Sequence, residues 1–170
     1  MTQDFSGFRP SKIWKRMSAE RRTEAAELFW SDEQSAEQQV EACATIATHM
    51  KFRAKSVITM PVEKKSQYVL AMPAVSEMLA ARLLVAYHLA HQRPMMGAFL
   101  DGLGIGHEEG IIAEEDVKPP SADALKKAAS SLAASYPAGD VSLYLSTLVW
   151  QDPDTWGALA ELPESQPVGG

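Results

Sequence analysis

The segment that most constrains the fold is residues 74–91, AVSEMLAARLLVAYHLAH, where apolar side chains recur around nearly the whole circumference of a helix. A surface helix has one apolar stripe, whereas a helix that is apolar on all sides is buried. Leu83 and Leu84, for example, fall on different faces, so both need neighbours. Arg82 and His88 interrupt the segment, which falls short of the roughly 20 apolar residues that cross a bilayer. We predict a central core helix and no membrane span.

Apolar residues at helical spacing continue along the rest of the chain, so we predict an all-α fold. The chain is expected to form a single-domain irregular bundle of seven or eight helices around the segment at about residues 74–91. This domain covers residues 1–162, and residues 163–170 form a disordered tail. The other helices are expected over residues 11–30 with a break near Ser18, 32–55, 62–72, 95–103, 121–135, 141–150 and 153–162.

Capping residues set the ends of several predicted helices. Ser31 and Gln34 form the S-x-x-Q pattern of a capping box, and Asp152 precedes a first-turn proline. Gly104 followed by the apolar Ile105 is typical of a left-handed helix end. Two short segments are ambiguous. Residues 56–59 are interpreted as a connector, and residues 141–150 as a helix, because a lone strand has no ladder to join.

Composition indicates an ordinary globular protein, with 46% hydrophobic and 22% charged residues. Its one cysteine, Cys43, excludes an intramolecular disulfide and lies on the apolar stripe of its helix, where it is expected to be inert. The first ten residues, MTQDFSGFRP, lack the basic and apolar regions of an export signal. We expect a soluble, acidic, cytoplasmic protein.

The net charge of −6 is unevenly distributed along the chain. Residues 1–100 hold 13 basic and 10 acidic side chains, whereas residues 101–170 hold 3 and 12. The basic side chains form an N-terminal and a central cluster, which would meet nucleic acid if folding joined them beside Phe8, Trp14 and Phe52. We rank nucleic-acid binding below protein binding, because the chain is acidic and has no recognition motif. The clusters comprise Arg9, Lys12, Lys15, Arg16, Arg21 and Arg22, and Lys51, Arg53, Lys55, Lys64 and Lys65.

His88 and His91 are the candidate metal ligands. They lie three residues apart, so both imidazoles share one face of the predicted helix. A third ligand would come from elsewhere in the chain, and the sequence does not choose between the donors. The alternative is that His88 packs against neighbouring helices and His91 meets the negative end of the helix dipole. The possible further donors are Glu77, His49, Asp101 and His107.

Other motifs for catalysis or cofactor binding are incomplete. Gly102, Gly104 and Gly106 are followed by His107 where a dinucleotide-binding loop requires glycine, and a helix precedes them instead of a strand. No Glu-x-x-His pair of a di-iron bundle is present, so we expect no cofactor. The loop at residues 104–120 exceeds the usual loop length and is the best candidate for a functional segment.

Methionine and tryptophan are frequent in this chain, with eight and four residues respectively. Met95 and Met96, with Met60, Met72 and Met78, would line an adaptable binding groove, or would simply fill the core. The first interpretation favours a non-enzymatic helical protein that binds a protein partner or associates with itself. The alternatives are a metal-binding protein or small metalloenzyme using the histidine pair, and a nucleic-acid-associated protein.

Overall fold

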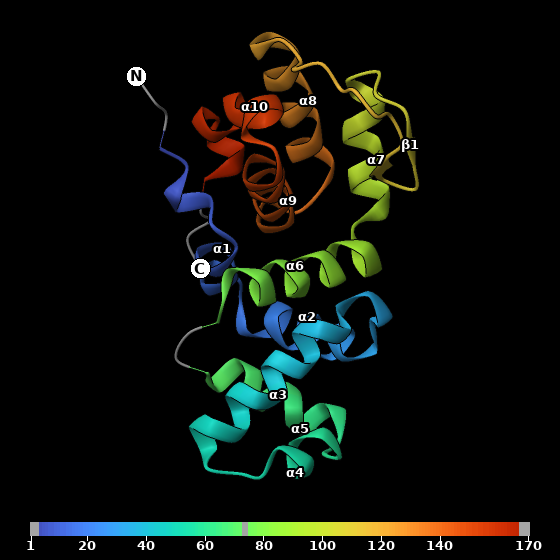
Figure 1. The fold of residues 1–170 in the computed structure, drawn as a ribbon. Coiled ribbons are helices and arrows are strands. Elements are labelled where there is room, and N and C mark those ends of the chain that lie inside the picture. The colour runs from blue at the N-terminus through green and yellow to red at the C-terminus, as the bar shows by residue number, and fades with distance from the viewer. Residues whose placement is uncertain (1–3, 73–74, 167–170) are drawn as a thin grey trace. The chain divides into compact units, whose positions relative to one another are not determined.

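The computed structural model describes residues 4–72 and 75–166, and within these ranges helices predominate. The all-α prediction is confirmed, and one short hairpin is the only sheet among the described residues. These ranges contain ten α-helices where seven or eight were predicted, because residues 10–16 and 19–31 form separate helices and a further short helix occupies residues 54–58. The elements are α1 (Pro10–Arg16), α2 (Ala19–Ser31), α3 (Ala36–Met50), α4 (Ala54–Ile58), α5 (Val62–Ala71), α6 (Glu77–His91), α7 (Arg93–Gly102), β1 (His107–Glu108), β2 (Ile111–Ile112), α8 (Ala122–Ser135), α9 (Ala138–Gln151) and α10 (Pro153–Trp156), labelled in part in Figure 1.

The chain divides into two compact units. Unit 1 comprises Met1–Arg16 and His91–Gly170, and unit 2 comprises Met17–Ala90. Each unit buries apolar side chains of its own, among them Phe99 and Leu145 in unit 1 and Phe29 and Ile46 in unit 2. A single domain over residues 1–162 stays a prediction.

Unit 1 is built around α9. Every residue from Asp140 to Val149 is buried, so this helix is enclosed on all sides. It packs against α1, α8 and α10 and against the 3-10 helices Ser6–Phe8, Gly157–Glu161 and Pro163–Ser165. The Phe99 ring of α7 meets the Tyr144 ring edge-on at 5.6 Å. The helical interpretation of residues 141–150 is thus confirmed, with the end-to-end burial expected of a core helix.

Serine hydroxyls satisfy the polar groups around α9. Ser142 and Ser146 both donate to the carbonyl of Ser165, at 3.3 and 3.1 Å. The Ser165 hydroxyl in turn donates to the carbonyl of Leu159 at 2.6 Å, so no hydroxyl of this group is buried without an acceptor. Residues 163–166 are therefore ordered on α9, and the predicted disordered tail is wrong for them; residues 167–170 lie outside the described residues.

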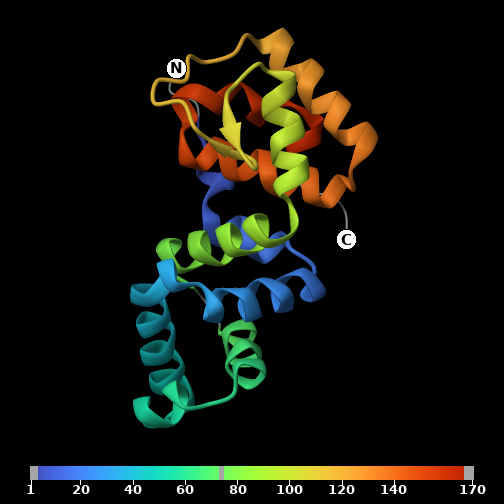
Figure 2. The ribbon, with the colours of Figure 1, turned by 90° about the vertical axis from the view of Figure 1, so that its right-hand side faces the viewer.

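The helix end predicted at Gly104 is confirmed in detail. Gly104 has φ +71°, its N–H donates to the carbonyl of Asp101, and the N–H of Ile105 donates to that of Leu100. These two bonds define a Schellman motif, and the Ile105 side chain packs back into the core. β1 and β2 follow as an antiparallel hairpin beside α7, drawn in yellow in Figure 2. The long loop is therefore shaped by a hairpin.

Unit 2 contains α2 to α5 and most of α6. α2 packs chiefly on α5, and α3 contacts both α4 and α5. Ser18 caps α2 as predicted, accepting the N–H of Arg21 at 3.2 Å. α6 buries seven of its residues, including Leu83 and Leu84, while the side chain of Met78 is 62% exposed. The predicted core helix is confirmed as a largely buried element that is open at Met78 near its start and at Ala90 and His91 at its end.

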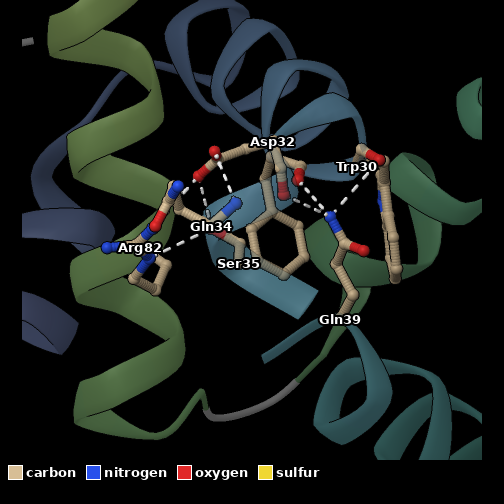
Figure 3. Close-up of polar contacts among 7 residues, drawn as sticks. Trp30, Asp32, Gln34, Ser35, Gln39 and Arg82 are labelled. Atoms are coloured by element: carbon tan, nitrogen blue, oxygen red, sulfur yellow. Dashed lines mark hydrogen bonds and ion pairs between the residues drawn. The ribbon is translucent and has the colours of Figure 1, made fainter. Parts of the chain in front are cut away.

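A polar cluster fixes the corner between α2 and α3 (Figure 3). Asp32 accepts the N–H of Gln34 at 3.1 Å and the hydroxyl of Ser35 at 2.6 Å. Arg82 from α6 donates to Ser35 at 3.0 Å and pairs with Asp32 at 3.3 Å. The amide of Gln39 donates to three carbonyls at the end of α2, including that of Asp32. These bonds supply acceptors and donors that two helix ends leave open.

Several boundaries differ from the prediction around this corner. α2 continues through Ser31, so the capping side chain is Asp32 and not Ser31. α3 begins at Ala36. α3 ends at Met50 instead of Lys55, and the expected connector at residues 56–59 is largely the helix α4. A helix of five residues carries too few repeats for its period to be visible in sequence.

The hairpin turn yields a stability prediction. Gly110 has φ +87°, and a Cβ there would lie 2.8 Å from Met96 Cβ and 2.9 Å from the Arg93 carbonyl oxygen. Gly104 has φ +71° and open space around its Cα. We expect Gly104→Ala to lower the free energy of unfolding by about 1–2 kcal/mol through backbone strain alone. Gly110→Ala is expected to cost more, and equal losses in urea unfolding would contradict this packing.

Candidate interaction surface

One end of unit 2 carries an exposed basic segment, which we call the basic tip and define as residues 50–65. It contains the end of α3, all of α4 and the first turn of α5, at the α4 label in Figure 1. The segment contains five basic residues and a single acid, Glu63. Val57 is the one fully buried apolar residue of α4 and anchors it. The rest of α4 is exposed and available for contact.

Most charges of the basic tip are not neutralised by the protein. Lys51, Arg53, Lys55 and Lys64 are exposed, and none takes part in an ion pair with any residue in the ranges 4–72 and 75–166. Lys65 differs, because its ammonium group lies 4.4 Å from the centre of the Trp30 ring in a cation–π contact. The tip thus presents four cations that are free to pair with a negatively charged partner, although the net charge of the protein is negative.

Apolar side chains are interleaved with these cations. Four of the eight large apolar side chains exposed in the described chain belong to the tip. Ile58 is the most open of them, at 61% exposure. Phe52 meets the Tyr68 ring edge-on at 5.5 Å, which orients it at the surface. Apolar groups surrounded by unpaired charge are typical of a binding site. The four side chains are Met50, Phe52, Ile58 and Val62.

Lys51 occupies a backbone conformation that disfavours it. It follows the last residue of α3 with φ +60°, while the N–H of Phe52 donates to the carbonyl of Ala47 at 2.9 Å. This is a left-handed helix end, where glycine is the usual residue. A non-glycine residue in this backbone region lowers the folding stability by on the order of 1 kcal/mol. Lys51 is therefore less favourable for local stability than glycine would be at this position.

A second charged surface lies in unit 1, and we call it the acidic loop, residues 104–117. It holds five acids and no lysine or arginine. Glu108, Glu115 and Asp116 are exposed, and Ile111 projects from β2 with 48% exposure. Glu109 and Gly110 form the two-residue turn, both with positive φ, as a type I′ hairpin requires. Residues 104–120 were predicted as a loop, and Glu109-Gly110 between short segments that contain apolar residues is the sequence signal for the hairpin.

Internal hydrogen bonds hold the acidic loop in one shape. The His107 ring bonds Asp101 through Nε2 at 2.8 Å and accepts the N–H of Gly110 through Nδ1 at 3.1 Å. Since Nδ1 accepts, Nε2 carries the proton and donates to the carboxylate. Glu114 accepts the N–H of Gly106 at 2.7 Å, and Arg93 pairs with Glu109 at 3.5 Å. Both ring nitrogens of His107 are therefore engaged in holding the hairpin.

The candidate metal ligands are placed differently from one another. His88 is buried, with its ring edge-on to Tyr87, while His91 is exposed at the end of α6. Glu77 lies on the same helix 11 residues before His88, about 16 Å along the axis at 1.5 Å per residue, too far for a shared ion. In residues 4–72 and 75–166 no three His, Cys, Asp or Glu side chains gather as a metal site. Metal binding by His88 and His91 stays a prediction.

The N-terminal basic cluster does not form the expected surface with its aromatic neighbour. Trp14 is buried, so its ring is closed to a nucleic-acid base. Arg16 donates to the Ser146 hydroxyl at 3.2 Å, and burial lowers the pKa of its guanidinium. Arg21 and Arg22 lie in the first turn of α2, whereas Lys65 contacts Trp30 in its last turn. Within unit 2, Arg21 and Arg22 therefore stand at the opposite end of α2 from Lys65, and the other four residues of the N-terminal cluster belong to unit 1.

Cys43 and three methionines, Met17, Met95 and Met96, are buried, whereas Met50 and Met78 are exposed. Met95 and Met96 are buried in unit 1, so the groove predicted from methionine content is not formed by this pair. Burial raises the pKa of the Cys43 thiol, and the positive charge of Lys65 counteracts this only in part. A thiol so placed is mostly protonated near neutral pH, as expected for core packing.

Comparison with known proteins gives no identification: no family model, curated protein or solved structure matches this chain. The part of the chain that the structure describes contains no helix long and apolar enough to span a bilayer.

The strained lysine of the basic tip provides a test of this geometry. We expect Lys51→Gly to raise the free energy of unfolding by about 1 kcal/mol, because glycine adopts positive φ without steric cost. Lys51→Ala removes the same charge but keeps the side-chain clash, so it should give no comparable gain. Urea unfolding of both variants measures the difference, and equal effects would show that charge and not backbone strain governs this position.

Proposed function

We propose that this chain is a non-enzymatic helical protein that binds a protein partner or a second copy of itself. The observation that carries the proposal is the basic tip, where four unpaired cations surround four exposed apolar side chains. Apolar contact supplies affinity once water is excluded, and unpaired surface charge accelerates encounter and selects the partner. No other surface of unit 2 combines the two features among its described residues.

The construction of the tip supports a contact role. Val57 anchors α4 while Ile58, beside it in sequence, points to solvent, so the exposed side chains stand on a fixed base. Phe52 is held by Tyr68 at the same end of the unit. A surface whose anchors are already positioned loses less conformational entropy on binding.

Nucleic-acid binding is the second candidate, and the exposed Phe52 ring among lysines favours it. Such a ring is able to stack on a base while the cations contact phosphates. Two features weigh against this candidate. The chain as a whole carries a net charge of −6, and the part of the N-terminal cluster that belongs to unit 2, Arg21 and Arg22, lies at the other end of α2 from Lys65.

Substitution of the exposed apolar side chains tests the proposed function. We expect Phe52→Ser with Ile58→Ser to abolish retention of specific proteins by the immobilised full chain, because the apolar centre of the surface is lost. The matched control is Val40→Ser, which removes a 71% exposed apolar side chain ten residues before the end of α3. Fold retention is checked by circular dichroism.

Two results would contradict the proposal. Equal protein recovery by both variants would remove the basic tip from the binding surface. Tip-dependent shifts of RNA or DNA in gels that vanish as salt rises, with no tip-dependent protein recovery, would transfer the function to nucleic acid.

A further inference from the structure

We propose that the occupant of the basic tip is a second copy of this chain, and that the segment which docks there is its acidic loop. The inference rests on the proposed function and specifies its partner. The contact is heterologous: the tip in unit 2 of one copy meets the loop in unit 1 of another.

Charge complementarity is the first argument. The tip holds five basic residues and one acid, while the acidic loop holds five acids and no base. The cations of the tip lack ion-pair partners in the described ranges, and Glu108, Glu115 and Asp116 lack them there too. Opposite fields of this kind steer two molecules into one register, and like-charged pairings of tip with tip or loop with loop are disfavoured.

Apolar complementarity is the second argument. Ile111 stands exposed on β2, between Glu108 and Glu115 in sequence. The tip has the reverse pattern, with Phe52 and Ile58 exposed among lysines. Each surface therefore has an apolar centre and a charged rim, the composition of a protein–protein interface.

Preorganisation is the third argument. His107 fixes the hairpin turn through Asp101 and Gly110, and Glu114 closes the loop on the Gly106 N–H. A loop held by these bonds docks without paying the ordering cost of a free segment. Ion pairs between exposed charges contribute little free energy on their own. The conformational entropy that a preformed loop does not lose on binding is therefore important for the affinity of the contact.

Backbone strain marks both surfaces. Lys51 and Glu109 are the only non-glycine residues with positive φ in the described chain, at +60° and +49°. One lies in the tip and the other in the loop, and each carries the charge of its surface. A charged residue kept in a conformation that favours glycine indicates a role other than local stability.

A contact between two different surfaces has a geometric consequence. Each copy offers one tip and one loop, so association closes as a two-fold dimer with both tip–loop contacts made, or continues into a larger ring or an open chain. The average mass is expected to rise with protein concentration and to fall as salt screens the charges. The screening length decreases from about 10 Å at about 0.1 M salt to about 3 Å at about 1 M.

Charge reversal provides the experiment, with sedimentation of the full chain as the measurement. The tip-reversed variant carries Arg53→Glu, Lys55→Glu and Lys64→Glu, which leaves two bases against four acids in the tip. The loop-reversed variant carries Glu108→Lys, Glu115→Lys and Asp116→Lys, which leaves two acids against three lysines in the loop. All six positions are exposed, so each substitution should change the folding stability by no more than about 0.5 kcal/mol. Each variant alone is expected to remain monomeric at concentrations where the unmodified chain associates. An equimolar mixture should associate again, because every tip then finds a loop of opposite charge.

Mutual rescue in the mixture, lost at high salt, would establish the contact, since damage to folding in either variant cannot be repaired by the other. A chain that stays monomeric at all concentrations overturns the inference, and so does association that tip reversal abolishes but loop reversal does not change. In both cases the proposed function survives if the tip retains another protein in the Phe52 and Ile58 experiment. Tip-dependent binding of RNA or of anionic vesicles by a strictly monomeric chain also overturns it.

Discussion

The complete burial of α9 is the constraint on which unit 1 depends. A helix enclosed on all sides must place its polar side chains against internal acceptors, because water cannot reach them. Ser142 and Ser146 meet this requirement by donating to the carbonyl of Ser165, so the last described residues are part of the core wall. Burial raises the pKa of the Tyr144 phenol in the same helix, which keeps that side chain neutral and compatible with an apolar environment.

Unit 2 solves a different problem, that of joining two helices through a tight corner. The carboxylate of Asp32 accepts from Gln34 and Ser35, and the guanidinium of Arg82 neutralises it from α6. Removing Arg82 would leave a partly buried carboxylate with fewer donors, and removing Asp32 would leave helix ends open. At the end of α3 away from this corner, α4 packs on α3 and buries Val57.

Sequence reasoning recovered what local chemistry determines and missed what depends on tertiary contact. Ser18, Gly104 and Ser121 end or begin helices as predicted, since each acts on backbone groups within a few residues of itself. The capping role of Asp32 was assigned to Ser31, because the partner that selects Asp32 is Arg82, distant in sequence. Of the candidate site, the central basic cluster was identified from the sequence, but the burial of Trp14 and the exposure of Ile58 were not, because no periodic pattern encodes either burial state.

Each of the two charged surfaces remains largely unneutralised within the described part of its own unit. The described basic tip belongs wholly to unit 2 and the acidic loop wholly to unit 1, and each is attached to its unit by few buried residues. Charged side chains on short, weakly anchored elements add little to the stability of a unit, because exposed pairs contribute about 0–1 kcal/mol. Both surfaces also expose apolar side chains, Phe52 and Ile58 in the tip and Ile111 in the loop. Exposure of these side chains to water is unfavourable in free energy. The proposed contact between copies would bury these apolar side chains and pair the exposed charges, and both surfaces are formed by exposed residues outside the two cores.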